Sequence, residues 1–273
     1  MLVADDSAAV QMFFRNIVDR SRIAIELITA GSGAECKRIL EQGDIDVAFI
    51  DVNMPDMSGL DAVGPARAGD KKAFVTVMSG TATAERLDMA RRTQAYEYLV
   101  KPFTAADVEG ILRNYRQISK RRKTLIVDDT KTMRRILRRV LERSVFRLDI
   151  DEAESGERAV ALCRDGGFDL VLLDFNMPGL NGIETLERIR SSEPDCKVIM
   201  ISAEHNEEQV RRALALGAAA FLHKPFFAHD VDRSLHTALG LKIPGLTANS
   251  PERAPAASLP DVCMPDDESA VVV

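Results

Sequence analysis

The segment Leu170-Val-Leu-Leu-Asp-Phe-Asn-Met-Pro178 joins a continuous apolar run to an aspartate, Asp174. An uninterrupted apolar run of this kind is typical of a strand that is covered on both faces, as in a parallel sheet. The motif Asp-x-Asn-Met-Pro at the end of the segment also begins at Asp51, 123 residues earlier. The chain therefore contains two predicted strands that each end at an aspartate followed by the same motif.

The chain is an internal repeat with a constant offset of 123 residues. Besides the two aspartate motifs, the offset relates an acidic pair, a serine and a Lys-Pro-Phe motif in each copy. These matches are Asp5-Asp6 with Asp128-Asp129, Ser79 with Ser202, and Lys101 with Lys224. Two copies are too few to stack as a solenoid, and each is long enough to bury its own core. The sequence therefore predicts two copies of one domain in tandem.

The two copies are expected to occupy residues 1–119 and 124–242. The segment between them, residues 120–123, is basic and too short to act as a flexible tether. After residue 242 the chain becomes acidic and rich in Pro, Ala and Ser, with little apolar periodicity. This composition predicts a disordered tail over residues 243–273.

Each copy alternates predicted strands with predicted helices. In the second copy the strand Leu125–Val127 ends at Asp128, and helical apolar spacing begins at Met133. The copy continues as (βα)5, which implies an α/β fold with a parallel sheet, right-handed crossovers and helices on both faces. In the first copy Gln94 stands where Gly217 ends a helix in the second, so the first domain is expected to be slightly less stable.

Composition excludes several classes of protein. With a net charge of −6 the chain has no general signature for binding polyanions, so nucleic acid is not an expected partner. The apolar runs are strand-sized, far short of the ~20 residues that cross a bilayer, so no membrane span is expected. The N-terminus lacks a secretory signal, which predicts a cytoplasmic protein. The four cysteines follow neither a zinc nor a disulfide pattern and are expected to fill apolar space.

The repeated acids follow strands and are expected to meet at one edge of each sheet. Doubly wound sheets bind ligands beyond the carboxyl ends of their strands. The converging acids would be Asp5, Asp6 and Asp51 in the first copy and Asp128, Asp129 and Asp174 in the second. Three crowded carboxylates require a cation, and hard oxygen ligands suit Mg²⁺.

The other repeated residues suit phosphoryl transfer, in which catalysis is mainly positioning and neutralisation of charge. A lysine can neutralise one phosphoryl oxygen, a serine hydroxyl can donate a hydrogen bond to another, and a carboxylate can act as the nucleophile that becomes an aspartyl phosphate. These residues are Lys101, Ser79 and Asp51 in the first copy and Lys224, Ser202 and Asp174 in the second.

Together these motifs resemble the CheY-like receiver domains of bacterial two-component response regulators. The resemblance covers about residues 1 to 240. It implies two flavodoxin-like domains with strand order 2-1-3-4-5, and phosphoryl transfer from a phosphohistidine. It also implies one Mg²⁺ per domain, bound by the acids and by the main-chain carbonyl of Asn53 or Asn176. Beyond transfer to aspartate and slow self-dephosphorylation no enzymatic activity is expected.

The resemblance also implies a conformational switch. Tyr98 and Phe221 match the aromatic switch position of the family, three residues before each lysine, although core positions in the last strand are an equal alternative. In the family, phosphorylation draws the serine inward, the aromatic follows, and the surface of the fourth helix, fifth strand and fifth helix is remodelled. That surface would be the output.

The expected function is that of a phosphorelay response regulator with two phospho-accepting receivers and no output domain, which signals through phosphorylation-dependent protein contacts. Expected partners are a sensor histidine kinase or a histidine phosphotransferase and an effector protein, and a homodimer is compatible with the sequence. The main alternative is a relay intermediate or phosphate sink, and a phosphorylation-independent scaffold is a further one. A haloacid-dehalogenase-type phosphatase would need Asp-x-Asp, whereas Asn53 and Asn176 occupy the second position.

Overall fold

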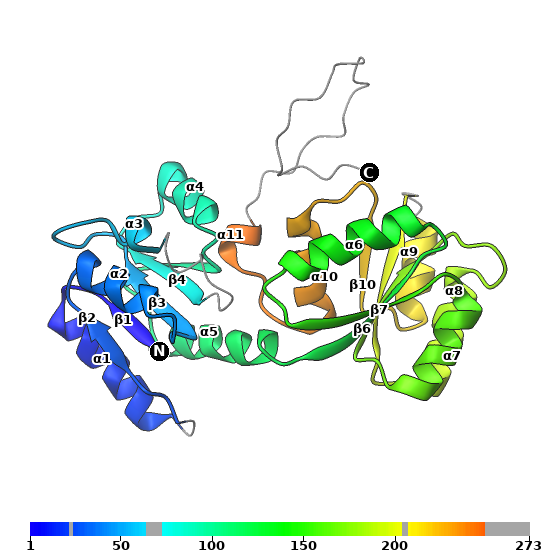
Figure 1. Ribbon diagram of the computed structural model, residues 1–273, viewed down its shortest axis with the longest axis horizontal. Coiled ribbons are helices and arrows are strands. Elements are labelled where there is room, and N and C mark those ends of the chain that lie inside the picture. The colour runs from blue at the N-terminus through cyan, green and yellow to red at the C-terminus, as the bar shows by residue number, and fades with distance from the viewer. Residues whose placement is uncertain (22–23, 64–72, 204–206, 249–273) are drawn as a thin grey trace, which may run out of the picture. The chain divides into compact units, whose positions relative to one another are not determined.

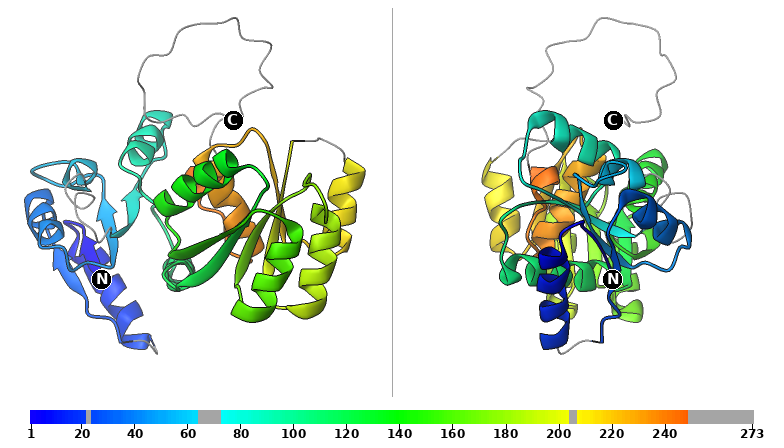
Figure 2. Two further views of the ribbon diagram at one scale, coloured as in Figure 1. Left: turned by 45° about the vertical axis from the view of Figure 1, so that its right-hand side comes forward. Right: turned by 90° about the vertical axis from the view of Figure 1, so that its left-hand side faces the viewer.

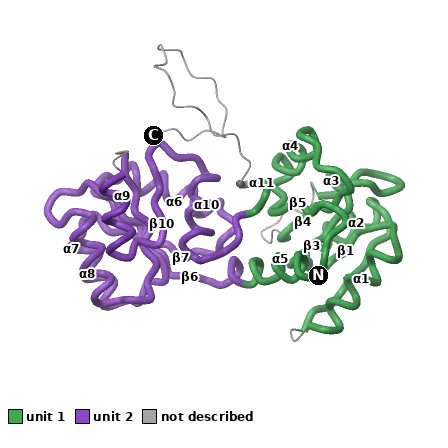
Figure 3. The backbone as a smooth tube through the Cα atoms, turned by 180° about the vertical axis from the view of Figure 1, so that it is seen from behind, with its two compact units in different colours: residues 1–116, 244–249 green, residues 117–243, 250–273 purple. Residues whose placement is uncertain are grey.

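Apolar runs that end on acids form the central strands of two separate sheets (Figure 1). The computed structural model describes residues 1–21, 24–63, 73–203 and 207–248. Within these ranges the chain divides into two units (Figure 3). The first comprises residues 1–116 and a short segment that begins at Pro244, and the second comprises residues 117–243.

The first unit contains a five-stranded parallel sheet in the order β2-β1-β3-β4-β5. Its strands are β1 (Leu2–Ala4), β2 (Ile28–Ala30), β3 (Val47–Asp51), β4 (Phe74–Ser79) and β5 (Glu97–Val100). Its helices are α1 (Ala8–Arg20), α2 (Gly33–Glu41), α3 (Gly59–Val63), α4 (Ala84–Arg92) and α5 (Ala105–Ile118). Every residue of β1, β3 and β4 is buried, as expected for strands covered by helices on both faces.

The second unit repeats this topology in the order β7-β6-β8-β9-β10, again with all strands parallel. Its strands are β6 (Arg122–Val127), β7 (Leu148–Ala153), β8 (Leu170–Asp174), β9 (Lys197–Ser202) and β10 (Ala220–His223). Its helices are α6 (Lys131–Arg143), α7 (Gly156–Gly166), α8 (Gly182–Ser192), α9 (Glu207–Ala215) and α10 (Ala228–Ala238). Helices α6 and α10 lie on one side of the sheet and α7, α8 and α9 on the other (Figure 2). The predicted strand order 2-1-3-4-5 is thus confirmed in both units.

Two predicted boundaries differ from the structure. Strand β6 begins at Arg122, because Arg122 and Lys123 already pair with Leu148 and Asp149. The Arg122 guanidinium is buried and donates hydrogen bonds to the carbonyls of Gln117 and Lys120, which satisfies its charge inside the unit. The linker predicted at residues 120–123 is therefore shorter, since its last two residues belong to the sheet.

The second difference concerns the predicted tail at residues 243–273. Residues Gly245–Ala248 form a short helix, α11, which belongs to the first unit. Leu246 is only 4% exposed and joins the core cluster that contains Ala90 and Tyr98. The first residues of the predicted tail are thus folded, because Leu246 is buried although the stretch around it has no apolar periodicity. Residues 249–273 lie outside the described residues.

The helix-ending position also differs between the units, as the sequence indicated. Gln94 has φ +54°, and Gly217 has φ +93°. Both values fall in the left-handed region, which costs a residue with a Cβ atom about 1–2 kcal/mol. A lower stability of the first unit remains a prediction. Of the cysteines, Cys36, Cys163 and Cys196 are buried and unpaired, as expected for apolar filling residues, and Cys263 lies outside the described residues.

Candidate phosphorylation sites

The acids that follow β1 and β3 meet at one edge of the first sheet. Asp51 is the last residue of β3, and Asp5 and Asp6 follow β1 directly. Because β1 and β3 are adjacent and parallel, their carboxyl ends lie side by side. One carboxylate oxygen of each acid lies within 4.8 Å of the others. The structure therefore brings together all three acids that the sequence selected in the first copy.

The second unit contains the same arrangement. Asp174 ends β8, while Asp128 and Asp129 follow β6, and their carboxylate oxygens again lie within 4.8 Å of one another. In both units the first acid of the pair and the strand-ending aspartate are buried, whereas the second acid of the pair is exposed. Each site therefore has two buried carboxylates and one solvent-exposed carboxylate.

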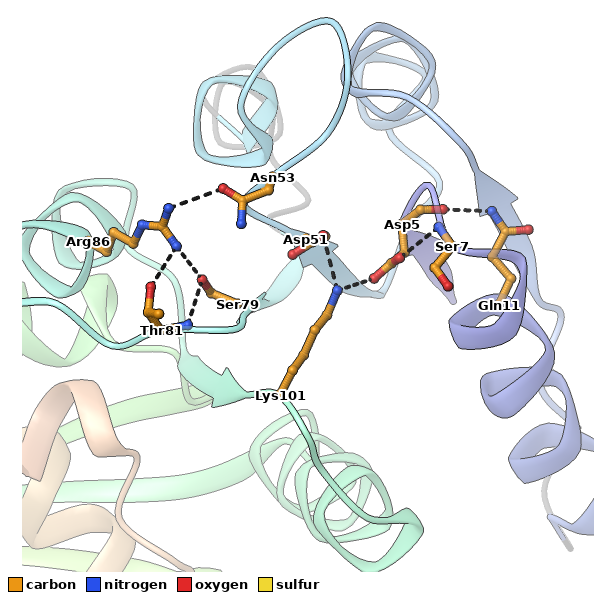
Figure 4. A network of polar contacts seen from close by, with 9 residues as sticks. All are labelled: Asp5, Ser7, Gln11, Asp51, Asn53, Ser79, Thr81, Arg86 and Lys101. Atoms are coloured by element: carbon orange, nitrogen blue, oxygen red, sulfur yellow. Dashed lines mark hydrogen bonds and ion pairs between the residues drawn. The ribbon is translucent and has the colours of Figure 1, made fainter.

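A lysine after the last strand connects the two buried carboxylates. Lys101 Nζ lies 2.7 Å from Asp5 Oδ2 and 3.0 Å from Asp51 Oδ2 (Figure 4). Lys224 Nζ lies 3.2 Å from Asp128 Oδ2 and 2.9 Å from Asp174 Oδ1. The backbone of each lysine is held by β4 or β9, since its amide donates to the carbonyl of Ser79 or Ser202. The lysine is thus aimed at the carboxylates by the sheet itself.

The charges of each site are strongly coupled. Burial raises the pKa of Asp51, although the hydrogen bond and charge of Lys101 partly oppose the shift. Burial likewise raises the pKa of Asp174, with Lys224 opposing it. Burial works against the charged form of each lysine, but the bonds to the carboxylates outweigh it and raise both lysine pKa values. The sites lack positive charge relative to their three acids, which favours a bound cation.

The donor set of the first site fits Mg²⁺. Asp51 Oδ1 is buried and has no hydrogen-bond partner among the described residues. A buried carboxylate oxygen of this kind is expected to bind a metal ion or a hydrogen-bond donor. Carboxylate oxygens are the ligands that Mg²⁺ prefers, and it usually binds through one or two of them together with a phosphate and several waters. Asp5, Asp6 and Asp51 would hold the ion in the first unit, and Asp128, Asp129 and Asp174 in the second. A contribution from the main-chain carbonyls of Asn53 and Asn176 remains a prediction.

Close packing brings the next helix to the acceptor strand. A Cβ atom at Gly59 would lie 2.0 Å from the carbonyl oxygen of Asp51, and one at Gly182 would lie 2.4 Å from that of Asp174. Only glycine permits this approach. The N-termini of α3 and α8 are thereby fixed directly beside the phospho-acceptor candidates, which explains the glycine in both copies.

The serine at the end of β4 is linked to a residue that the sequence analysis missed. Ser79 is completely buried, and its Oγ accepts a hydrogen bond of 2.7 Å from Arg86 Nη1. The same guanidinium donates to Thr81 Oγ1 at 2.9 Å and to Asn53 Oδ1 at 3.2 Å (Figure 4). Arg86 stands in the first turn of α4, outside every repeated motif. The only sequence signal was a difference between the copies, because the corresponding residue of the second is Gln209.

A second missed position orients the acidic pair. Gln11 Nε2 donates a 2.8 Å hydrogen bond to the carbonyl of Asp5, and Arg134 Nη1 donates a bond of the same length to the carbonyl of Asp128. Gln11 and Arg134 are equivalent by the 123-residue offset. Each lies on the first helix of its unit and fixes the backbone from which the acidic pair projects.

The two candidate switch aromatics differ in their contacts. Tyr98 is 9% exposed, and its hydroxyl donates a 2.6 Å hydrogen bond to the carbonyl of Thr81. Thr81 also contacts Arg86, so Tyr98 is two hydrogen bonds away from the guanidinium beside Ser79. Phe221 is partly buried against the core of the second unit. A switching role for either residue remains a prediction.

Comparison with known proteins agrees with this fold and site. The family model described as the response regulator receiver domain matches residues 1–113 and 124–236, so the chain belongs to the response regulator receiver family. The chemotaxis protein CheY-3 of Vibrio cholerae is 39% identical over 120 residues, covering 43% of this chain and 92% of that protein. The nitrate/nitrite response regulator protein NarL of Escherichia coli is 33% identical over 114 residues, covering 42% of this chain and 53% of NarL.

A solved structure shows the tandem fold. It is described as a putative two-component system response regulator/GGDEF domain protein, and it matches 88% of this chain and 97% of its own with a TM-score of 0.63. At 21% identity this match supports the fold alone. No helix among the described residues has the length and apolar character to span a membrane. The chain is thus a response regulator with tandem receiver domains, as the sequence predicted.

Proposed function

We propose that both receivers accept a phosphoryl group, on Asp51 and on Asp174, and that the protein signals by changing its contacts with other proteins. The observation that carries this proposal is the duplicated geometry of the buried acceptor. In each unit a strand-ending aspartate lies beside a second buried carboxylate and within 3.0 Å of a lysine. A structural salt bridge needs one carboxylate, whereas two carboxylates and one lysine leave an excess of negative charge that suits a metal and a phosphoryl group.

In the proposed reaction one carboxylate oxygen of Asp51 forms a bond to phosphorus, while the bond between phosphorus and the histidine nitrogen of the donor breaks. Lys101 moves from a carboxylate oxygen to a phosphoryl oxygen, and the Ser79 hydroxyl donates to another. Bound Mg²⁺ would neutralise charge on the phosphoryl group. Lys224 and Ser202 would perform the same steps at Asp174. The partner that supplies the phosphoryl group would be a histidine kinase or a histidine phosphotransferase.

The proposed output is a change in protein contacts rather than turnover of a small substrate. Ser79 and Tyr98 are connected through Arg86 and Thr81, so movement of the serine toward a phosphoryl group alters the contacts of an aromatic residue on β5. Such a connection favours a protein whose surface responds to phosphorylation over a phosphate sink, which needs none. An effector protein that binds the α4 and β5 surface would read this change.

Intact-mass spectrometry after incubation with acetyl phosphate and Mg²⁺ tests the proposal. The wild type should gain two phosphoryl groups, Asp51→Asn and Asp174→Asn one each, and the double variant none. Addition that survives in the double variant, or no addition to the wild type from either acetyl phosphate or a phosphorylated histidine donor, would overturn it.

A further inference from the structure

Arg86 is placed at the phosphorylation site of the first unit by contacts with two loops. Its guanidinium bonds Asn53, two residues beyond Asp51, and Ser79 and Thr81, at and after the end of β4. Strands β3 and β4 are adjacent, with Asp51 opposite Met78, so these contacts flank the acceptor carboxylate. In Figure 4 the guanidinium faces the gap between Asn53 and Ser79. Arg86 thus brings a second cation to the edge of the sheet at which Lys101 lies.

The second unit has no arginine at this position. The offset of 123 residues places Gln209 there, while the aspartate, asparagine, serine and lysine of the site are all identical between the copies. Gln209 Oε1 is buried and has no hydrogen-bond partner among the described residues. A glutamine amide has two N–H donors and no charge, so it cannot reproduce the five donors and the positive charge of a guanidinium. The serine side of the first site therefore has a cation that the second site lacks at the equivalent position. Another charge difference, Gln11 against Arg134, lies at the acidic pair, and there Arg134 is ion-paired with Glu152.

We propose that Arg86 binds the phosphoryl group on Asp51 and prolongs its lifetime, so that the first receiver holds its phosphoryl group longer than the second. This inference rests on the proposed function, because it requires an aspartyl phosphate at Asp51. A phosphoryl group has three strongly accepting oxygens, and a guanidinium presents a planar fork that matches them. Ser79 already lies within hydrogen-bond distance of the Arg86 fork, so a phosphoryl oxygen that accepts from Ser79 comes within reach of Arg86 as well.

The direction of the effect follows from the movement of charge during hydrolysis. A water oxygen bonds to phosphorus, the bond from phosphorus to the Asp51 oxygen breaks, and the water hydrogens leave with inorganic phosphate. In a loose transition state negative charge moves from the phosphoryl oxygens to the departing carboxylate. We expect Arg86, held on the phosphoryl oxygens and away from the departing carboxylate, to bind the aspartyl phosphate more tightly than this transition state and so to slow the reaction. Lys101 lies within reach of the Asp51 carboxylate, so it can return to that carboxylate as negative charge develops there, whereas Arg86 forms no hydrogen bond with the Asp51 carboxylate within the described part of the chain.

The rate of phosphoryl loss from each site tests the inference when Arg86 and its counterpart Gln209 are each replaced by the other residue type. In an Asp174→Asn background the protein is phosphorylated with acetyl phosphate and Mg²⁺, the donor is removed, and the decay of the phosphorylated mass is followed. Arg86→Gln should accelerate loss from Asp51 by about 10-fold, the size expected for one charge-assisted hydrogen bond, and Arg86→Lys should lie between. In an Asp51→Asn background Gln209→Arg should slow loss from Asp174.

The reciprocal variant tests a gain as well as a loss, and the circular dichroism of each variant before phosphorylation shows whether its fold is intact. Decay of Arg86→Gln at the wild-type rate or more slowly, or a Gln209→Arg variant without a longer lifetime, would overturn the inference. If Asp51 with Arg86 intact accepts no phosphoryl group, the proposed function itself fails. The two failures are therefore distinguishable in one set of spectra.

Discussion

The backbone amide of Gly245 donates a 2.9 Å hydrogen bond to Glu97 Oε1, although 148 residues separate them in sequence. Beside this bond Leu246 is buried in the core of the first unit, and its carbonyl accepts a hydrogen bond from Arg91 Nε at 3.2 Å. The segment after the second receiver therefore completes the first at α4 and β5. This is also the surface that the proposed effector would read.

Replacing Leu246 by Ala should destabilise the first unit by about 2–4 kcal/mol, because it removes a buried side chain and leaves a cavity. The chain has three tyrosines, at positions 96, 98 and 115, and no tryptophan, so tyrosine fluorescence reports on the first unit alone. The measurement is the denaturant dependence of that fluorescence. The control Met12→Ala, at a side chain that is 56% exposed, should change stability by less than about 0.5 kcal/mol. An unchanged Leu246→Ala transition would show that α11 is not docked.

Gln94→Gly should stabilise the first unit by about 0.5–1 kcal/mol. Glycine relieves the cost of a side chain at φ +54°, and part of this gain is lost to the greater freedom of glycine in the unfolded chain. The matched change Gly217→Ala should destabilise the second unit, since φ is +93° and the added Cβ would lie 2.9 Å from Arg190 Nε. Tyrosine fluorescence for the first variant and circular dichroism for the second measure these shifts. A destabilising Gln94→Gly would refute the account of helix ending.

Mg²⁺ should stabilise each unit through its own acidic cluster. A ligand that binds only the native state stabilises it by about 1.4 kcal/mol at ten times its Kd. Addition of Mg²⁺ should therefore raise the tyrosine-detected unfolding midpoint, and EDTA should reverse the effect. Asp6→Asn removes an exposed acid of the cluster without breaking the contacts of Lys101, and it should abolish this response. Asp129→Asn, the matched change in the second unit, should leave the response of the first unit intact; equal effects of both variants would contradict separate sites.

The contribution of Asp232 to the stability of the second unit should be lost as pH rises from about 4 to about 6. Burial raises the pKa of Asp232 to about 6, and a hydrogen bond from Ser144 opposes the shift only in part. A folded-state pKa above the unfolded value of about 3.9 stabilises the protein below that value, and this contribution is lost as pH rises through 6. Asp232→Asn should therefore be more stable than the wild type at pH 7, by about 1–3 kcal/mol, with little difference at pH 4.

The neighbouring imidazole of His236 has the opposite effect, since burial lowers its pKa and its contribution is lost as pH falls. Circular dichroism should therefore compare Asp232→Asn with the wild type at each pH, because the contribution of His236 cancels in the difference. A difference that is constant between pH 4 and pH 7 would contradict the assignment to Asp232.

The repeat made most of the fold predictable. Strand-sized apolar runs that end on Asp51 and Asp174, with helical spacing between them, were sufficient to predict two (βα)5 domains, and the resemblance to receiver domains supplied their strand order. The convergence of the acids followed from the same reasoning, because carboxyl ends of adjacent parallel strands share an edge. Constant spacing between motifs made these inferences stronger than any single motif.

The remaining features depend on tertiary contacts that leave no local pattern. Arg86 lies on an exposed helix turn, and only its hydrogen bonds to Ser79 and Asn53 distinguish it from a solvated arginine. Arg122 appeared to belong to a basic linker, since its burial depends on carbonyls that the fold brings to it. Leu246 stands in a short stretch with Pro and Gly and without apolar periodicity, and its burial depends on packing against α4 and β5.

The central claim is that Asp51 and Asp174 carry the phosphoryl groups, and chemical trapping tests it most directly. Borohydride reduces an aspartyl phosphate to homoserine, so the protein is phosphorylated with acetyl phosphate and Mg²⁺, reduced, digested and sequenced by mass spectrometry. The account predicts homoserine at positions 51 and 174 and at no other aspartate. Homoserine at Asp5, Asp6, Asp128 or Asp129, or phosphate retained on a serine or threonine, would contradict it.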